Sequence, residues 1–371
     1  MKILQLGKFY PIRGGVEKVM YDIMLGLSER GIQCDMLCAS TEGHPQQNIK
    51  VNDFATVFVI KTSLNVAATK LAPKMISKLR KIAANYDIIH IHHPDPMATL
   101  ALFMAGYKGK VILHWHSDIL KQKTLLYIYM PLQTWLIKRA DMIVGTTPVY
   151  VQQSEFLKDY EHKINFIPIG VLPIDADQSI VQRIKNENKG KTLIFSLGRL
   201  VEYKGFEYLI ESAKYLSEDY RIIIGGKGPL QESLENLIKL NNLQEKVNLI
   251  GFLSDEEAYA YFMATDIFVL SSIIKTEAFA IVQIEAMSCS KPIITAHIPG
   301  SGVSWVNKHN TSGLICNRKN PQELAECIKL LGENKDLYNK LSLGAKNRYQ
   351  ENFHRNVMVD KTLQLYYMLI K

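Results

Sequence analysis

Short apolar runs rich in β-branched residues alternate with amphipathic stretches along almost the whole chain of 371 residues. Such alternation predicts βα units, in which helices cover a parallel sheet. Helices are expected between the apolar runs, for example at 16–30 and 132–140. Strands of the first half are expected at 2–6, 33–38, 56–60, 88–92, 110–114, 142–145 and 164–167. The chain is therefore predicted to be an α/β protein.

The pattern is interrupted once and then resumes. Pro168 opens a break that includes a polar stretch at 177–191. After it, strands are expected at 192–197, 221–225, 247–250, 267–270, 292–295 and 313–315. The interruption predicts two doubly wound domains, residues 1–168 and 169–354. A ligand is expected in a central cleft between them, at the carboxyl ends of the strands.

The net charge of +8 is concentrated in the first half. Residues 1–170 hold 20 Lys and Arg against 13 Asp and Glu, whereas 171–371 hold 24 against 23. The densest segment, 61–81, has no acidic residue, and its apolar residues recur at helical spacing: Leu71, Met75, Ile76, Leu79 and Ile82. This basic segment predicts an amphipathic helix that either covers the core or lies on an anionic membrane surface. No recognition motif accompanies the charge, so nucleic acid is not expected as a partner.

Five cysteines lie mostly within apolar runs, at positions 34, 38, 289, 316 and 327. An odd number in such surroundings predicts reduced core residues of a cytoplasmic protein. The first seven residues are expected to form a core strand, not a secretory leader. No uncharged apolar stretch reaches the roughly 18 residues of a membrane span, so any membrane contact is expected to be peripheral.

Gly14 and Gly15 follow the first expected strand and precede a helix. Glycines at this place let backbone amides approach an anion. The spacing is not G-x-G-x-x-G, and no acidic residue ends the second strand at the required distance, which argues against a dinucleotide. The pair indicates either an ordinary turn or a phosphate contact.

Arg199 and Lys204 follow the first strand of the second domain. Two fixed cations suit a diphosphate, because they neutralise the charge that develops on it as a leaving group. The alternative is two surface cations beside a helix cap. Two further strands end in the glycine-rich run 225–228 and in 251–253. Gly226 and Leu253 are therefore expected to border a nucleotide.

Glu277 and Glu285 lie eight positions apart in a segment that is otherwise apolar enough to be core. Eight positions are a little over two helical turns, so both carboxylates are expected on roughly one helix face. Acids beside free amides at a helix start suit a ligand that carries hydroxyls and phosphates. The alternative is that Glu277 is only an N-terminal charge and that Glu285 is solvated.

Five histidines end two strands of the first domain: His90, His92, His93, His114 and His116. Histidine clusters suggest a metal, but no Cys or carboxylate completes a spaced ligand set, so no metal is expected. Asp175 and Asp177 have the D-x-D form with which some transferases hold a metal diphosphate. They lie in a polar connector away from a strand end, and we interpret them as linker.

Together these motifs resemble those of the retaining GT-B glycosyltransferases, in the large family that includes sucrose synthase and bacterial mannosyltransferases. The resemblance spans nearly the whole chain, with motifs in order at 14–17, 116–118, 198–199 with 204–205, 225–228 and 277–285. The stretches 116–119 and 121–123 are similar to those of bacterial polysaccharide enzymes. Many of those look like GDP-mannose-dependent mannosyltransferases of O-antigen or capsule assembly.

The resemblance implies two Rossmann-like domains, with residues 355–371 returning to complete the first. The second domain then binds the nucleotide sugar, and the first faces the acceptor. Catalytic roles fall on Glu277, His116, Arg199 and Lys204. Donor contacts fall on Gly14, Gly15, Arg199, Lys204, Gly226, Leu253, Phe279, Ala280, Ile281 and Glu285. Acceptor-side roles fall on Glu17, His93 and Asp118.

By the same resemblance, Arg199 and Lys204 hold the donor diphosphate without a metal. Glu277 contacts the sugar, Glu285 the ribose, and His116 lines the sugar site. The co-substrate is GDP-mannose or a UDP-sugar, no other cofactor is implied, and the acceptor is a lipid-linked glycan at the cytoplasmic face of an anionic membrane. The departing phosphate serves as the base, since no protein nucleophile stands out.

One departure from the family pattern is that Ala278 and Ala280 stand where glycines are common. The added methyls are expected to narrow the donor pocket or alter the choice of sugar, without abolishing activity, because alanine fits ordinary backbone geometry. The departure also motivates a rival hypothesis, a non-catalytic sugar-nucleotide-binding subunit of a glycan assembly complex. A basic nucleic-acid binder is a third hypothesis.

Overall fold

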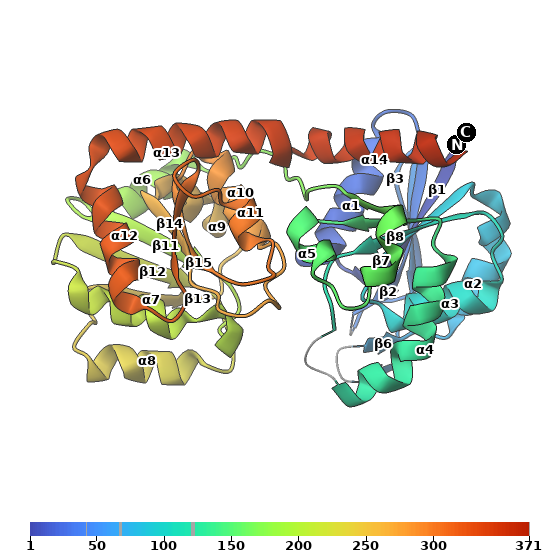
Figure 1. Cartoon of the computed structure of the whole chain (residues 1–371), viewed down its shortest axis with the longest axis horizontal. Helices are drawn as coiled ribbons and strands as arrows, with labels where there is room; N and C mark the ends of the chain where they lie inside the picture. The colour runs from blue at the N-terminus through green and yellow to red at the C-terminus, as the bar shows by residue number, and fades with distance from the viewer. Residues whose placement is uncertain (42, 67–68, 120–122, 371) are drawn as a thin grey trace. The chain divides into compact units, whose positions relative to one another are not determined.

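The computed structural model describes residues 1–41, 43–66, 69–119 and 123–370, and the side chains of 65, 66, 69 and 123–125 lie outside this description (Figure 1). The chain divides into two compact units. The first comprises Met1–Gly170 together with Arg355–Lys371, and the second comprises Val171–His354. This division falls two residues after the boundary expected at 168.

In the first unit, the described strands form an eight-stranded sheet in the order β10-β9-β8-β7-β1-β2-β4-β3. Neighbours run parallel except β3 and β4, which are antiparallel. The strands are β1 (Lys2–Tyr10), β2 (Gln33–Ser40), β3 (Gln47–Asn52), β4 (Ala55–Ile60), β7 (Ile88–His93), β8 (Lys110–Trp115), β9 (Met142–Gly145) and β10 (Ile164–Phe166). The strand order reverses between β1 and β7, so ligand-binding residues are expected at their carboxyl ends.

The helices of the first unit are α1 (Gly15–Ser28), α2 (Lys74–Ile82), α3 (Pro96–Ala105), α4 (Lys123–Arg139), α5 (Pro148–Gln152) and α14 (Arg355–Ile370). Helix α14 lies beside α1, as Figure 1 shows in red and blue. Arg355 at its start donates to Glu29 Oε2 at 2.5 Å, and Tyr366 is fully buried. The expectation that the last helix returns to the first domain is confirmed.

The basic segment 61–81 is not one helix, so that prediction was wrong. Strands β5 (Leu64–Val66) and β6 (Thr69–Leu71) form an antiparallel hairpin, and only Lys74–Ile82 is helical. Pro73 precedes α2, and proline both lacks an N–H and disfavours helical geometry in the residue before it. Met75 and Leu79 are fully buried. The apolar face of α2 is therefore part of the core and is not free to insert into a membrane.

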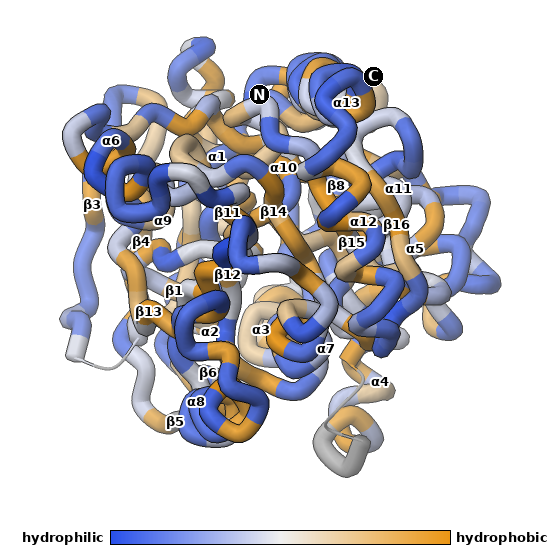
Figure 2. Tube along the Cα trace, turned by 90° about the vertical axis from the view of Figure 1, so that its left-hand side faces the viewer, coloured by the Kyte–Doolittle hydropathy of each residue, from blue (hydrophilic) through white to orange (hydrophobic). Residues whose placement is uncertain are grey.

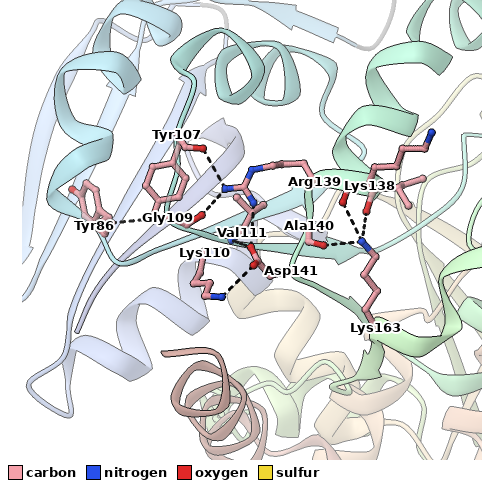
Figure 3. A network of polar contacts seen from close by, with 11 residues as sticks. Tyr86, Tyr107, Gly109, Lys110, Val111, Lys138, Arg139, Ala140, Asp141 and Lys163 are labelled. Carbon is pink, nitrogen blue, oxygen red and sulfur yellow. Dashed lines mark hydrogen bonds and ion pairs between the residues drawn. The ribbon is translucent and has the colours of Figure 1, made fainter. Parts of the chain in front are cut away.

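Helix α4 is longer than the predicted 132–140, and a polar network holds its C-terminal end (Figure 3). Lys163 Nζ donates to the carbonyl oxygens of Ile137, Lys138 and Ala140 at 3.0, 3.2 and 2.9 Å. Arg139 donates to the carbonyl oxygen of Gly109, just before β8, at 2.5 Å. Cations that bond the last carbonyls stabilise a helix end, and here they also join α4 to the sheet.

In the second unit, the described strands form a six-stranded parallel sheet in the order β13-β12-β11-β14-β15-β16. They are β11 (Thr192–Leu197), β12 (Tyr220–Gly225), β13 (Val247–Gly251), β14 (Ile267–Leu270), β15 (Ile293–His297) and β16 (Gly313–Asn317). Each lies within two residues of its prediction, because strands buried on both faces read as continuous apolar runs. Strand β14 is orange along its length in Figure 2. The strand order reverses between β11 and β14.

The α-helices of the second unit are α6 (Gln178–Glu187), α7 (Phe206–Ser212), α8 (Gln231–Leu240), α9 (Asp255–Ala264), α10 (Ile281–Ser288), α11 (Val303–Val306), α12 (Pro321–Glu333) and α13 (Lys335–Arg348). Short turns of other helix types lie at Glu202–Lys204, Ala213–Tyr215 and Tyr349–Phe353. The core of this unit gathers around β11, β12 and β14.

All five cysteines are free; three of them are buried, whereas Cys289 and Cys327 are only partly buried. Burial raises the pKa of the Cys34 and Cys38 thiols. No helix in the described part of the chain has both the length and the apolar character that a membrane crossing requires.

Candidate active site

The loops that follow β11 and β14 bring Lys204 and Glu277 together at the switch point of the second sheet. Lys204 Nζ lies 2.5 Å from Glu277 Oε2, and each side chain is only 10% exposed. The same carboxylate oxygen accepts a hydrogen bond from Ser272 Oγ at 2.8 Å. The lysine stem passes over Gly198, where a Cβ would lie 3.2 Å from its Cε. The cation is therefore held in one position by packing and by a buried partner.

Gly205 explains why these two loops can meet. Its φ is +63°, and a Cβ at this position would overlap the carbonyl oxygen of Ser271. Ser271 Oγ donates to the carbonyl oxygen of Lys204 at 2.9 Å, and Ile273 N donates to that of Tyr203 at 2.9 Å. Glycine alone permits this contact of backbone with backbone, so the residue after Lys204 determines where the lysine lies.

Glu277 and Glu285 do not share a helix face, so that expectation was wrong. Glu277 lies in the loop before α10, and its backbone carbonyl accepts from Ser301 Oγ. Helix α10 begins only at Ile281, and Glu285 lies partly buried within it. The two glutamates are therefore positioned separately, the first by contacts of the loop and the second by the helix.

Ala280 starts α10 in the left-handed region, with φ 62° and ψ 84°. The expectation that alanine sits there in ordinary backbone geometry was wrong for this residue, since left-handed geometry costs an L-residue about 1–2 kcal/mol. No side-chain hydrogen bond caps the helix. Phe279 packs its ring against Phe353 at 6.0 Å, so its side chain belongs to the core of the unit. Uncapped amides at a helix start attract anions.

Arg199 is exposed, and across the described ranges its guanidinium makes no hydrogen bond or ion pair. It follows β11 directly and shares a loop with Lys204. The fold leaves this second cation unpaired beside a pair that is already complete. A free guanidinium suits a phosphate, which it binds with two parallel hydrogen bonds.

The glycine-rich run after β12 has a structural reason that the sequence did not disclose. A Cβ at Gly226 would overlap the carbonyl oxygen of Gly198, and one at Gly228 would overlap that of Leu200. These glycines let the run pack against the loop that carries Arg199. Leu253 packs against Gly225. The adjacent Phe252 is 69% exposed. Its stretch 251–253 was predicted to lie beside the base, but its ring was not singled out as a platform for it.

In the first unit, Gly14 precedes α1 with φ 133°, Gly15 opens the helix with φ 58°, and no side chain caps the helix. Burial raises the pKa of Glu17, and the nearby Lys8 cation partly offsets this rise. Lys8, whose cation affects Glu17, was not predicted as a candidate functional residue. It is buried, its Nζ donates to the carbonyl oxygen of Pro94 at 2.5 Å, and its backbone N–H donates to Asp95 at 2.6 Å. Its position directly after an apolar run was the only signal.

The histidines of β7 and β8 form a buried cluster. Ring nitrogens of His90, His92 and His114 lie within 4.8 Å of one another. However, His92 uses both nitrogens, one toward His116 at 2.9 Å and one toward Gln5 at 2.8 Å. Of these three, His90 and His114 alone retain an uncommitted nitrogen. Burial lowers the pKa of every member, so the rings are neutral.

The remaining first-unit candidates face partners within the protein. Asp118 accepts from Trp115 Nε1 at 2.9 Å and from Ser154 Oγ at 2.7 Å, so it braces the loop that carries His116. His93 stacks on Trp115 with ring centroids 3.8 Å apart. Of the stretch 121–123, residues 121 and 122 and the side chain of 123 lie outside the described residues.

Asp177, the second acid of the D-x-D sequence, caps helix α6. Its carboxylate accepts from Ser179 N at 2.7 Å. Asp175 is exposed in the same connector. This placement agrees with the interpretation of the pair as linker.

The second unit thus places a fixed cation, a free guanidinium and an uncapped helix start on loops that leave the same edge of its sheet. Groups of each kind can bind phosphate oxygens. Together they fit a diphosphate, and Glu277 adds a carboxylate that can accept a hydrogen bond from a hydroxyl. The combination is typical of a site for a nucleoside diphosphate joined to a sugar.

Comparison with protein families matches both parts of the chain. Residues 177–348 match the family described as glycosyl transferases group 1, and residues 13–172 match the family described as glycosyltransferase family 4. The chain is 30% identical to an O-antigen chain mannosyltransferase C of Escherichia coli, over 100% of this chain and 99% of the relative. It is 28% identical to a D-rhamnosyltransferase of Pseudomonas aeruginosa, over 95% and 92% of the two chains.

Solved structures share the fold at low identity. Sucrose-phosphate synthase from Thermosynechococcus elongatus has a TM-score of 0.80 and 17% identity, over 100% of this chain and 99% of that one. The Anabaena protein HepE, solved in complex with UDP, has a TM-score of 0.78 and 19% identity, over the full length of both chains.

Proposed function

Since the chain belongs to the family 4 glycosyltransferases of the GT-B fold, we propose that it transfers mannose from GDP-mannose to a lipid-linked glycan of an O-antigen or related surface polysaccharide. The observation that carries the proposal is the pairing of Lys204 with Glu277 beside the free guanidinium of Arg199. This arrangement supplies cations for a diphosphate leaving group and a carboxylate for the sugar.

The choice of sugar follows from the relatives. One is named for mannose and the other for D-rhamnose. D-Rhamnose is 6-deoxy-D-mannose, so both names indicate the manno configuration at the ring carbons. A UDP-sugar is the alternative donor, because HepE was solved with UDP. The sequence identity to HepE is low, and we favour the mannose donor.

The transfer proceeds with retention in our proposal. The bond between the anomeric carbon and the diphosphate oxygen breaks, and the acceptor hydroxyl oxygen bonds to the same face of that carbon. The hydroxyl proton passes to the departing phosphate, and GDP leaves. Arg199, Lys204 and the amides at the start of α10 stabilise the developing charge, and preorganised groups of this kind are commonly the largest catalytic term. Glu277 and Glu285 bind hydroxyls of the sugar and the ribose.

These cations take the role that a divalent metal plays in other transferases, so we propose metal-independent transfer. Asp177, the second acid of the D-x-D sequence, is engaged in capping α6. Activity is expected to survive EDTA. Inhibition that Mg²⁺ or Mn²⁺ reverses would contradict this point.

We place the enzyme at the cytoplasmic face of the membrane as a peripheral protein. Lys61, Lys74 and Lys81 of the basic segment are exposed. On α4 of the same unit, Tyr127 is 81% exposed and Ile128 is 74% exposed. Basic groups attract anionic lipid headgroups, and exposed apolar side chains add partial insertion.

A donor panel tests the proposed function. The purified chain is incubated with GDP-mannose, UDP-glucose or UDP-galactose, with and without a lipid-linked glycan, and nucleotide release and anomeric configuration are measured by NMR. We expect GDP release that requires the acceptor, and a product with the donor's configuration. Binding of GDP-mannose without transfer to any glycan acceptor would favour the non-catalytic subunit that the strained Ala280 also suggests.

A further inference from the structure

A hollow of about 470 Å³ opens at the carboxyl edge of the first sheet. It lies between the loop that follows β2 at Ser40 and the loop that follows β4 at Ile60. Ligand pockets commonly measure roughly 300–1,000 Å³, so the hollow has room for a short oligosaccharide. None of its described lining residues has been assigned to the donor or to the acceptor.

Hydrogen bonds tie the wall of the hollow to three strands. Thr62 N donates to Ser40 Oγ at 3.0 Å, and Thr62 Oγ1 donates to the carbonyl oxygen of Ser40 at 2.5 Å. Thr41 N donates to the carbonyl oxygen of Tyr10, the last residue of β1, at 2.7 Å. A ligand therefore meets polar groups that are already held in place, which lowers the entropy cost of binding.

His44 contributes an unused imidazole to this lining. Its ring meets the ring of Tyr10 edge to face, with centroids 5.6 Å apart and planes at 89°. The residue is partly exposed, and neither ring nitrogen is buried or hydrogen-bonded within the described chain. A neutral imidazole can accept a hydrogen bond at one nitrogen and donate one from the other. The ring of His44 is therefore positioned by Tyr10 and still open to a ligand.

Hydroxyl groups supply most of the other polar lining. Ser63 is exposed, and its hydroxyl makes no hydrogen bond within the described ranges. Thr62 is partly exposed, and its hydroxyl can still accept a bond while it donates to Ser40. Lys61 also lines the hollow, but its charge has already been assigned to the lipid surface. Glu42 lies outside the described residues. Serine and threonine hydroxyls both donate and accept, as the hydroxyls of a sugar do, so this lining suits a sugar ring.

The hollow lies beside the switch point of the first sheet, not at it. Strand β2 pairs with β1, β4 pairs with β2, and all three run parallel. Neighbouring strands are about 4.8 Å apart, so the ends of β2 and β4 lie roughly 5 and 10 Å from the end of β1. A group bound in the hollow is therefore close to the switch point between β1 and β7 but leaves that point free for another part of the same ligand.

We propose that this hollow binds an inner residue of a manno-configured acceptor glycan, behind the terminal residue that receives the new sugar. The contacts fall on the imidazole of His44 and on the hydroxyls of Thr62 and Ser63. The acceptor in this proposal rests on the proposed function. Such a subsite makes the enzyme prefer a longer acceptor over a single sugar residue, because only the longer chain fills the hollow while its end lies at the switch point.

Binding is tested first, on the full-length protein with ¹³C-labelled histidine rings, in phosphate-free buffer and without donor. The NMR signal of His44 is identified by its absence in the variant His44→Phe. We expect mannotriose to shift this signal at a concentration at least about tenfold lower than methyl α-mannoside does, since linked residues engage neighbouring subsites together. No shift with mannotriose, or equal concentrations for the two sugars, would overturn the proposal. A shift with inorganic phosphate in place of mannotriose would mark an anion site instead.

The contacts are tested by the double variant His44→Phe with Ser63→Ala. Phenylalanine keeps a ring against Tyr10 and removes only the nitrogens. We expect the KM for an octyl mannotrioside acceptor to rise about tenfold, as the loss of one or two hydrogen bonds predicts. The KM for octyl mannoside and the KM for GDP-mannose are expected to stay unchanged, and thermal unfolding checks that the variant folds.

The matched control is His162→Phe with Ser77→Ala, at two exposed positions of the same unit that do not line the hollow. All three KM values are expected to stay unchanged in this control. An unchanged KM for the trisaccharide in the test variant, or an equal rise for the monosaccharide, would overturn the subsite. Failure of the wild-type protein to release GDP would instead contradict the proposed function, and the titration without donor would still decide this proposal.

Discussion

Lys204 and Glu277 form a buried ion pair across 73 positions of sequence, with Nζ 2.5 Å from Oε2. The loops that carry them follow β11 and β14, where the strand order of the second sheet reverses. Taking two charges out of water is costly unless they are paired and hydrogen-bonded. Here Ser272 adds a third contact to the same oxygen. The pair is therefore part of the fold as well as of the proposed donor site.

Replacing Lys204 by Met is expected to impair both stability and rate. The variant leaves the Glu277 carboxylate buried without its cation, and breaking such a pair commonly costs about 3–5 kcal/mol. The loss of one charge-stabilising donor lowers kcat by about 10²–10³-fold. Urea unfolding and initial rates measure the two effects. In the double variant Lys204→Met with Glu277→Gln, stability is expected to recover in part while the rate stays low. A stable and active Lys204→Met protein would show that the pair is dispensable.

Ala280→Gly is expected to stabilise the protein by about 0.5–1 kcal/mol. Glycine removes the left-handed strain of about 1–2 kcal/mol but adds unfolded-state entropy of about 0.5–1 kcal/mol. Ala278→Gly is the matched control, since Ala278 does not have a positive φ. The control substitution is expected to destabilise the protein. The midpoint of urea unfolding is measured for both variants. A lower midpoint for the Ala280→Gly protein than for wild type would mean that the surrounding loops favour the methyl group.

The first unit is expected to lose stability as the pH falls below about 6.5. Burial lowers the pKa of His93 and of His114 to about 3, whereas an unfolded imidazole titrates near 6.5. Between these values the unfolded chain binds protons that the folded chain does not, so stability rises with pH in this window and is flat above it. At pH 5.5 each such histidine lowers the free energy of unfolding by about 1.4 kcal/mol relative to its value above pH 7.

The variant His114→Leu isolates one of these contributions. His114 has two buried nitrogens without partners among the described residues, so leucine removes a polar group that the fold does not satisfy. The difference in unfolding free energy between pH 7.5 and 5.5 is expected to shrink by about 1.4 kcal/mol. An unchanged difference would indicate that His114 already titrates in the folded protein.

Charge reversal at Lys61, Lys74 and Lys81 is expected to release the protein from anionic vesicles. These lysines are exposed, and each cation near such a surface contributes about 1 kcal/mol, so affinity falls by roughly a hundredfold or more. The control reverses Lys214, Lys239 and Lys308 of the second unit, which are also exposed. Transfer to a water-soluble acceptor is expected to be unchanged. Equal loss in both variants would point to net charge alone, and no loss in either would remove the membrane role of the basic segment.

The sequence predicted the fold better than the site. Strands such as Ile267–Leu270 are apolar on both faces, and that signal is local. The hairpin of β5 and β6 was missed because the helical spacing of the apolar residues from Leu71 to Ile82 was extended to the whole basic segment, whereas only Lys74–Ile82 is helical. The special geometry of Ala280 was missed because the composition of a segment does not reveal the φ angle at which a helix starts.

The contacts within the site depend on loops that meet only in the folded chain. Arg199 and Lys204 were predicted together, but nothing in their spacing distinguishes the free cation from the paired one. Gly226 was predicted only to border a nucleotide, and the fold shows in addition that its missing Cβ admits the carbonyl of Gly198. Gln5 lies in an apolar run, and only the folded chain shows that its side chain bonds to residues of β7 and α14.

The kcat of Arg199→Ala in acceptor-dependent GDP release from GDP-mannose tests the donor site most directly. The side chain is exposed and unpaired within the described chain, so its removal is expected to change stability by no more than about 0.5 kcal/mol. We predict a fall in kcat of about 10²–10³-fold with an unchanged unfolding midpoint. Near-normal turnover by this variant would contradict the assignment of the donor diphosphate to the switch point of the second unit.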